Sequence, residues 1–77
     1  FDIARRHISH VALISDDDIR AAQRDLWRRL QLVTEPGGAA AFAALLSGAY
    51  RPERDERVGI VICGANTTME AFGALLA

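Results

Sequence analysis

The 77-residue chain contains no lysine, since all nine of its basic residues are arginines. Its own residues therefore cannot form a lysine Schiff base with a carbonyl group. A single cysteine, Cys63, excludes an internal disulfide and any zinc site built from several cysteines. No apolar run is long enough for a transmembrane helix. The net charge is −1 and the sequence has no strongly basic tail that would bind nucleic acid. Membranes and nucleic acids are thus not expected as partners.

The sequence also lacks an initiator methionine, because Phe1 opens the chain and the only methionine is Met69. No signal peptide or transit sequence is visible. Hydrophobic residues make up 51% and charged residues 25%, the balance of an ordinary globular domain. We therefore expect the chain to be a piece of a larger polypeptide, with no separate domains of its own.

The first half of the chain predicts a buried strand followed by a helix. Residues 10–14 form a short apolar run that is typical of a strand buried on both faces. Ser15 and Asp18 then form a capping-box pattern. Apolar residues follow at helical spacing and predict one buried stripe, made of Ile19, Ala22, Leu26, Leu30 and Val33. The solvent side is expected to carry Arg20, Gln23, Arg24 and Arg28, with ion pairs Asp16–Arg20 and Asp25–Arg29.

The second half predicts helix, strand and helix. Pro36 suits the first position of a helix that continues through an almost entirely apolar stretch to Ser47, and Gly48 suits its end. Because this stretch is nearly all Ala, Leu and Phe, the helix is expected to be buried on most sides. Residues 50–57 are a charged surface loop, and residues 58–62 have the pattern of a second buried strand. A capping-box pattern from Thr67 to Glu70 opens a last helix that reaches Leu76. The predicted class is α/β, a strand-helix-helix-strand-helix fragment of a larger parallel sheet.

Two turns are candidate ligand sites, because ligands collect beyond the carboxyl ends of strands in open α/β sheets. The first is Cys63-Gly64-Ala65-Asn66, where the glycine permits close approach and the helix behind it directs amide groups toward the same space. The local pattern by itself favours a plain turn with a buried, inert cysteine. The second is Glu35-Pro36-Gly37-Gly38, where the local pattern favours a carboxylate that caps the start of its helix over one that faces a site.

Other polar residues give weaker signals. His7 and His10 have no cysteine or carboxylate at the spacing of metal ligands, so both are interpreted as structural or solvent-exposed. The acidic run 16–18 lies in the first turn of a helix, where acids are expected in any case. Trp27 is expected to pack against a neighbouring element. No catalytic residue and no metal site is predicted.

Three motifs in this order resemble the C-terminal part of the catalytic domain of threonine dehydratases. These are pyridoxal-phosphate enzymes of fold type II, with the tryptophan-synthase-β-like fold that serine racemase shares. The motifs are Leu13-Ile14-Ser15-Asp16-Asp17-Asp18-Ile19, Glu35-Pro36-Gly37-Gly38-Ala39 and Val61-Ile62-Cys63-Gly64-Ala65-Asn66. Each motif is weak alone, but together they span most of the chain. The resemblance implies that residues 1–77 are a C-terminal fragment of one such catalytic domain.

The resemblance also implies a role for four residues in binding pyridoxal 5′-phosphate. Cys63 takes the place of the residue that donates a hydrogen bond to the pyridine nitrogen, and Gly64 leaves room for the ring. Asn66 corresponds to an asparagine that shapes the turn, and Glu35 to a glutamate close to the ring. Ala65 departs from the pattern, because the family has a second glycine there, so the turn must accommodate a Cβ. Thr67-Thr68 departs from the hydrophobic-acidic pair that is common after the asparagine.

The parent protein is then expected to be a cytoplasmic, homo-oligomeric lyase that deaminates L-threonine to 2-oxobutyrate and ammonia by β-elimination. The Schiff-base lysine and the glycine loop for the phosphate would lie in the remainder of the domain, so the 77 residues alone are expected to be inactive. Serine dehydration, racemisation and threonine synthesis remain open. Two readings of other classes also remain: a stand-alone small α/β binding module, and a fragment that is domain-swapped or oligomerised through unpartnered strand faces.

Overall fold

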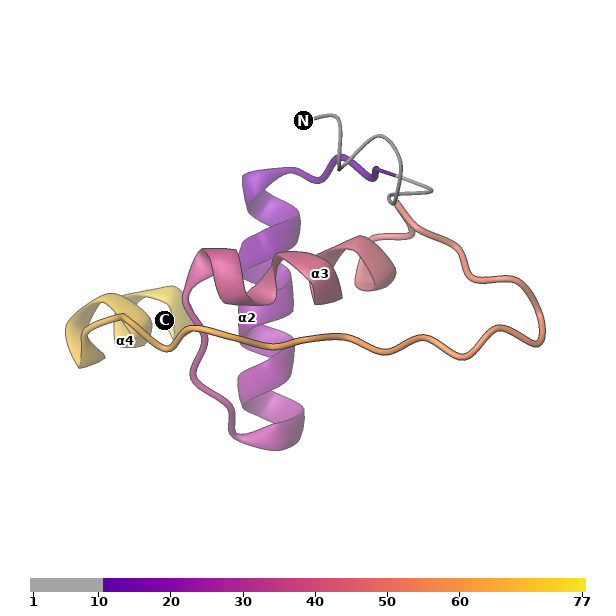
Figure 1. The fold of residues 1–77 in the computed structure, drawn as a ribbon. Helices are drawn as coiled ribbons and strands as arrows, with labels where there is room; N and C mark the ends of the chain where they lie inside the picture. Colours follow the sequence, from indigo (N-terminus) through magenta and orange to yellow (C-terminus); the bar gives the residue numbers. More distant parts are fainter. Residues whose placement is uncertain (1–10) are drawn as a thin grey trace, which may run out of the picture.

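A computed structural model describes residues 11–77, which form three α-helices joined by irregular segments (Figure 1). Helix α2 spans Asp16–Leu30, α3 spans Pro36–Leu46 and α4 spans Met69–Leu76. α3 crosses α2, and α2 packs against both of the other helices (Figure 1). Three helices were predicted in these places, and their existence is confirmed. His7 and His10 lie outside the described residues.

α2 begins with the predicted capping box. The amide of Asp18 donates to Oγ of Ser15 at 3.0 Å, and the amide of Ser15 donates to Oδ2 of Asp18 at 3.2 Å. These reciprocal bonds satisfy backbone donors that have no partner inside the helix. The start of α2 is therefore fixed by residues adjacent in sequence, which is why the pattern predicts it correctly.

One of the two predicted ion pairs of α2 is present. Arg29 Nε lies 3.0 Å from Asp25 Oδ1, as expected. Arg20 pairs with Asp17, one turn away, and not with Asp16 as predicted. The side chain of Arg20 is 49% exposed and that of Arg29 is 71% exposed, so solvent screens both pairs and each contributes little to the free energy of unfolding.

The buried face of α2 differs from the prediction in two places: its C-terminal end is exposed, and Gln23 is buried. Ala22 and Leu26 are buried in the core, but Leu30 is 63% exposed and Val33 is exposed as well. The helix ends at Leu30, and Gln31 adopts a left-handed conformation with φ 58°, so Val33 no longer follows the helical spacing. Gln23, predicted to face solvent, is only 5% exposed because the chain after Gln31 folds back over it.

α3 begins at Pro36, as predicted, and Gly48 follows its end with φ 82°. Its residues Ala39 and Ala43 pack with Ala22 and Leu26 of α2 to form the buried core. The helix was expected to be buried on most sides, but it buries one face, and Leu46 remains 43% exposed. Small alanine side chains on α3 allow the two helices to approach closely.

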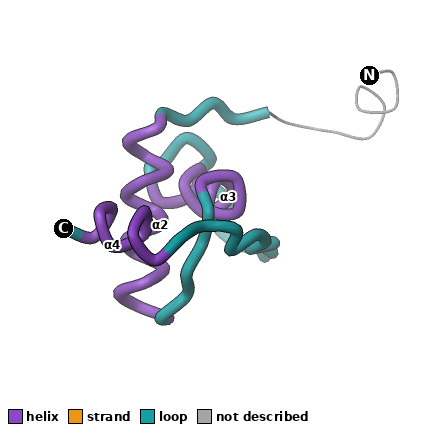
Figure 2. Tube along the Cα trace, turned by 90° about the vertical axis from the view of Figure 1, so that its left-hand side faces the viewer, coloured by secondary structure: helices purple, strands orange, loops and turns teal. Residues whose placement is uncertain are grey.

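Neither predicted strand forms within the described residues, as the absence of strand colour in Figure 2 shows. Residues 11–14 and 58–62 run as irregular chain, extended in the view of Figure 1. A strand requires backbone pairing with a neighbour, and residues 11–77 supply no such pairing for these segments. The side chains still divide into two faces: Ile14 and Ile62 pack on the core, whereas Leu13 and Val61 are exposed.

α4 starts one residue later than its capping-box pattern predicted. Thr68 is the cap, and its hydroxyl accepts a hydrogen bond from the amide of Ala71 at 3.0 Å. The predicted box between Thr67 and Glu70 is therefore wrong. α4 packs on α2 through the rings of Trp27 and Phe72, whose centroids are 5.7 Å apart at 76°. The expectation that Trp27 packs against a neighbouring element is confirmed. No helix in the described part of the chain is long and apolar enough to cross a membrane.

Truncation of the buried leucine of α2 should cost more stability than truncation of the exposed one. Leu26 is 4% exposed and lies in the core, so Leu26→Ala should lower the free energy of unfolding by about 2–5 kcal/mol. Leu30→Ala, on the same helix, is the matched control and should cost about 0.5 kcal/mol or less. Urea denaturation of both variants measures the difference. Equal losses would contradict the packing described here.

Candidate functional site

The structure brings the two candidate turns together. The amide of Glu35, at the start of α3, donates a hydrogen bond to the carbonyl oxygen of Gly64 at 3.0 Å. Figure 1 shows the segment that leads into α4 passing the start of α3. The Glu35 and Cys63 motifs, nearly thirty residues apart in sequence, therefore lie side by side.

Gly38 allows this close approach. It is buried in the first turn of α3, and an added Cβ would overlap the carbonyl oxygen of Cys63 and lie 2.8 Å from the carbonyl carbon. Both of these are backbone atoms and cannot move aside as a flexible side chain would. Glycine at position 38 thus lets the first turn of α3 pack directly on the backbone of Cys63.

Gly64 is required for two reasons. Its φ of +79° is a left-handed conformation that favours glycine. The space that a Cβ would take is filled by the side chain of Glu35, whose Cδ would lie 2.7 Å away. The Glu35 carboxylate makes no capping hydrogen bond to its own helix. Glu35 therefore lies at the start of its helix, as the local pattern favoured, but its side chain does not cap the helix and lies on the Cys63-Gly64 turn.

The other residues of the turn are accessible. Cys63 is a free, exposed cysteine, so the local expectation that this thiol is buried is wrong. Ala65 is not among the described residues with positive φ, so a Cβ is compatible with the backbone there. Asn66 is exposed at the centre of a tight turn, in which the amide of Thr67 donates to the carbonyl oxygen of Ala65 at 2.8 Å.

Within residues 11–77, no group of three or more His, Cys, Asp or Glu side chains is arranged to hold a metal ion. The acidic run 16–18 instead belongs to the start of α2, where Asp18 completes the capping box and Asp17 pairs with Arg20. At the two turns, the thiol of Cys63 can donate a hydrogen bond and the carboxylate of Glu35 can accept one.

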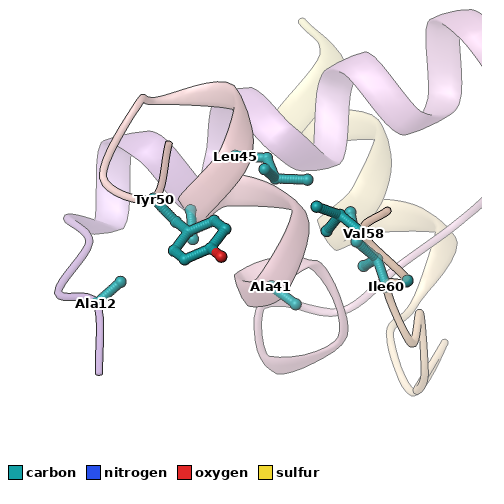
Figure 3. A pocket seen from close by; sticks show the side chains of 8 residues that line it. Ala12, Ala41, Leu45, Tyr50, Val58 and Ile60 are labelled. Carbon is teal, nitrogen blue, oxygen red and sulfur yellow. The ribbon is translucent and has the colours of Figure 1, made fainter. Parts of the chain in front are cut away.

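A separate cavity of about 330 Å³ lies beside the C-terminal half of α3, and Figure 3 shows the side chains that line it. Its lining is apolar apart from Tyr50, and includes Ala12, Ala41, Leu45, Val58 and Ile60. The Tyr50 hydroxyl donates to Oε2 of Glu56 at 2.5 Å, which lowers the pKa of Glu56 and raises that of Tyr50. The sequence placed both residues in a charged loop and gave no signal for this pair. No residue of the Cys63 turn lines this cavity.

Residues 1–64 match the family of pyridoxal-phosphate dependent enzymes, and the chain belongs to that family. The resemblance inferred from the three motifs is thereby confirmed. Membership implies the fold type II architecture and pyridoxal phosphate as the cofactor of the parent enzyme. The two strands expected from that architecture are the part that residues 11–77 do not form.

Several curated relatives are similar over almost the whole chain. A phenylserine dehydratase of Ralstonia pickettii is 40% identical over 72 residues, which cover 94% of this chain and 22% of that protein. A serine racemase of Dictyostelium discoideum is 30% identical over 77 residues, which cover 99% of this chain and 24% of that protein. A catabolic L-threonine dehydratase of Staphylococcus aureus is 27% identical over 78 residues, which cover 99% of this chain and 22% of that protein. The chain spans less than a quarter of the length of these relatives. No solved structure matches.

The residues of the turn fit the ring of this cofactor. A pyridine nitrogen accepts one hydrogen bond, and Cys63 offers an exposed thiol that is not in a disulfide. Gly64 beside it has no side chain of its own, and the space that a Cβ would take there holds the carboxylate of Glu35, so this carboxylate borders the thiol-bearing turn. The chain has no lysine, so the covalent attachment of the cofactor requires residues outside it.

Substitution of Gly38 by alanine should disturb the Cys63 turn, whereas substitution of Gly37 by alanine should not. Gly38→Ala places a Cβ against the Cys63 carbonyl and should lower the free energy of unfolding by about 1–3 kcal/mol. Gly37→Ala is the matched control, because nothing lies within 4 Å of its added Cβ. That variant should be neutral, or more stable by about 1 kcal/mol or less through helix propensity. Urea denaturation compares the two, and equal effects would show that the close approach is absent.

Proposed function

We propose that residues 1–77 are the C-terminal segment of one pyridoxal-phosphate dependent catalytic domain, and that the whole protein is a threonine (serine) dehydratase. Its net reaction converts L-threonine to 2-oxobutyrate and ammonia, with loss of the β-hydroxyl. The observation that supports this proposal is the exposed Cys63 thiol on a glycine turn held against Glu35. The 77 residues supply one wall of the cofactor pocket and no catalytic base. The remainder of the catalytic domain, and a second copy of the protein, are the proposed partners.

Cys63 is proposed to hold its proton on Sγ and donate it in a hydrogen bond to the ring nitrogen. Pyridoxal phosphate, when bound, supplies an electron sink for negative charge at the α-carbon of the amino acid. A neutral thiol does not fix a positive charge on the ring nitrogen as a carboxylate does. The electron sink is then milder, which suits elimination of a β-hydroxyl more than reactions that need a long-lived carbanion.

Glu35, Gly64 and Asn66 are proposed to complete this wall. Glu35 supports the turn through its main-chain bond to Gly64 and places its carboxylate beside the thiol-bearing backbone. Gly64 is proposed to border the ring, with the side chain of Glu35 in the space that a Cβ of residue 64 would take. Asn66 shapes the exit of the turn into α4, since the Thr67–Ala65 hydrogen bond spans it.

The names of the relatives support a dehydratase of β-hydroxy amino acids. A phenylserine dehydratase, an L-threonine dehydratase and an L-threo-3-hydroxyaspartate ammonia-lyase are each named for a substrate with a hydroxyl on the β-carbon. A serine racemase, 30% identical over 77 residues, favours racemisation of serine as the second candidate. A milder electron sink favours elimination over racemisation, so dehydration is the function we propose.

A substrate panel tests the proposal on the full-length polypeptide that carries these residues. We expect 2-oxobutyrate from L-threonine and pyruvate from L-serine, measured by reduction of the 2-oxo acid with NADH. The 77-residue chain alone is the control and should form neither product. If phenylpyruvate from threo-phenylserine is the main product, the preferred substrate is phenylserine and not threonine. If L-serine yields D-serine and no pyruvate, the protein is a racemase and not a dehydratase.

Conservative replacement of Cys63 tests its role as a neutral donor. Cys63→Ser keeps a neutral hydrogen-bond donor and should leave the affinity for pyridoxal phosphate within about threefold of the unmodified protein. Cys63→Ala removes the donor and should weaken the affinity about fivefold to tenfold, the effect of one hydrogen bond. Fluorescence titration of the cofactor-free full-length protein measures both. A large loss of cofactor affinity in Cys63→Ser, or no loss in Cys63→Ala, would show that Cys63 does not act as the neutral donor to the cofactor.

A further inference from the structure

Gln23 makes a buried hydrogen bond that the sequence did not lead us to expect. Its side chain lies on α2 and is 5% exposed, and its Nε2 donates to the carbonyl oxygen of Thr34 at 2.8 Å. Thr34 is itself buried, in the loop between α2 and α3. The bond therefore ties the middle of α2 to the residue immediately before Glu35.

The two hydrogen bonds near Glu35 share one peptide group. The carbonyl of Thr34, which accepts from Gln23, and the amide of Glu35, which donates to Gly64, belong to the same planar unit. That peptide is trans, because no described peptide bond is cis, so its oxygen and its hydrogen point in opposite directions. A single rigid plane therefore connects the side chain of Gln23 to the carbonyl of Gly64.

Rotation of this plane would displace the turn that carries Cys63. Pro36 follows directly and restricts the backbone of Glu35, so the peptide has little freedom on that side. On the other side, Gln23 supplies the donor that keeps the Thr34 carbonyl pointing at α2. Without this donor a buried carbonyl lacks a partner, and the plane can turn toward water.

We infer that Gln23 is a positioning residue for the cofactor site: it holds the Thr34–Glu35 peptide so that its amide supports the Cys63-Gly64 turn. This inference rests on the proposed function. The side-chain hydrogen bond of Gln23 is to Thr34 and not to the turn. Its effect on the cofactor passes through one peptide group and one main-chain hydrogen bond.

The neighbouring residue provides a matched control. Arg24 also donates a side-chain hydrogen bond to a main-chain carbonyl, from Nε to the oxygen of Leu75 at 2.9 Å, but this bond ties α2 to the end of α4. Gln23→Met and Arg24→Met thus each remove one tether of the same kind from α2. Gln23→Glu keeps the shape of the side chain, loses the amide donor and serves as the second variant if Gln23→Met fails to fold.

The first measurement is hydrogen–deuterium exchange of the Glu35 amide in the cofactor-free full-length protein. Because Pro36 has no amide hydrogen, exchange in the pair 35–36 reports Glu35 alone. Exchange should be about tenfold faster in Gln23→Met and Gln23→Glu, in keeping with one buried hydrogen bond, and unchanged in Arg24→Met. Unchanged exchange in the Gln23 variants would overturn the tether.

The second measurement is the affinity of the same proteins for pyridoxal phosphate, by fluorescence titration. The Gln23 variants should bind about tenfold more weakly, and Arg24→Met should bind as the unmodified protein does. Faster exchange with unchanged affinity would reduce Gln23 to a purely structural role and overturn the inference. If the unmodified protein binds no pyridoxal phosphate, the proposed function fails, and exchange at Glu35 still decides separately whether the tether exists.

Discussion

The peptide between Thr34 and Glu35 is the unit on which the arrangement of this chain depends. Its carbonyl accepts from a buried glutamine of α2 and its amide donates to Gly64, so it joins a helix to a turn nearly thirty residues further along. A trans peptide is planar and resists twisting. The position of the turn is therefore set by α2 as well as by the helix that the turn touches.

Close backbone approach makes this connection possible. Gly38 lets the first turn of α3 rest on the carbonyl of Cys63, and Gly64 accepts both a left-handed backbone and the side chain of Glu35. A third contact comes from the alanines of α3, which bring that helix close to α2. The site is therefore built mainly from main-chain contacts between small residues, with the thiol of Cys63 as an exposed side chain at its surface.

Local features of this chain were predictable, and features that depend on distant contacts were not. The start of α2 and the start of α3 at Pro36 follow from neighbouring residues, so their patterns suffice. The two candidate turns were identified, but their hydrogen bond was not, because it depends on how the loop after α2 folds back. That same fold-back buries Gln23, which periodicity assigned to solvent. The strands predicted at 10–14 and 58–62 do not form within residues 11–77, because strand formation depends on pairing partners that these residues do not provide to one another.

The segment between α3 and the Cys63 turn is held independently at its two ends. Gly48 terminates α3 at one end, and Gly38 and Glu35 fix the turn at the other, whereas residues 51–59 are exposed throughout. Closing a longer loop between fixed points costs only about 0.6 kcal/mol for each doubling of its length. A change in the length of this exposed stretch is therefore expected to cost little free energy, so the length of the chain between the two motifs is a poor guide to whether the site is intact.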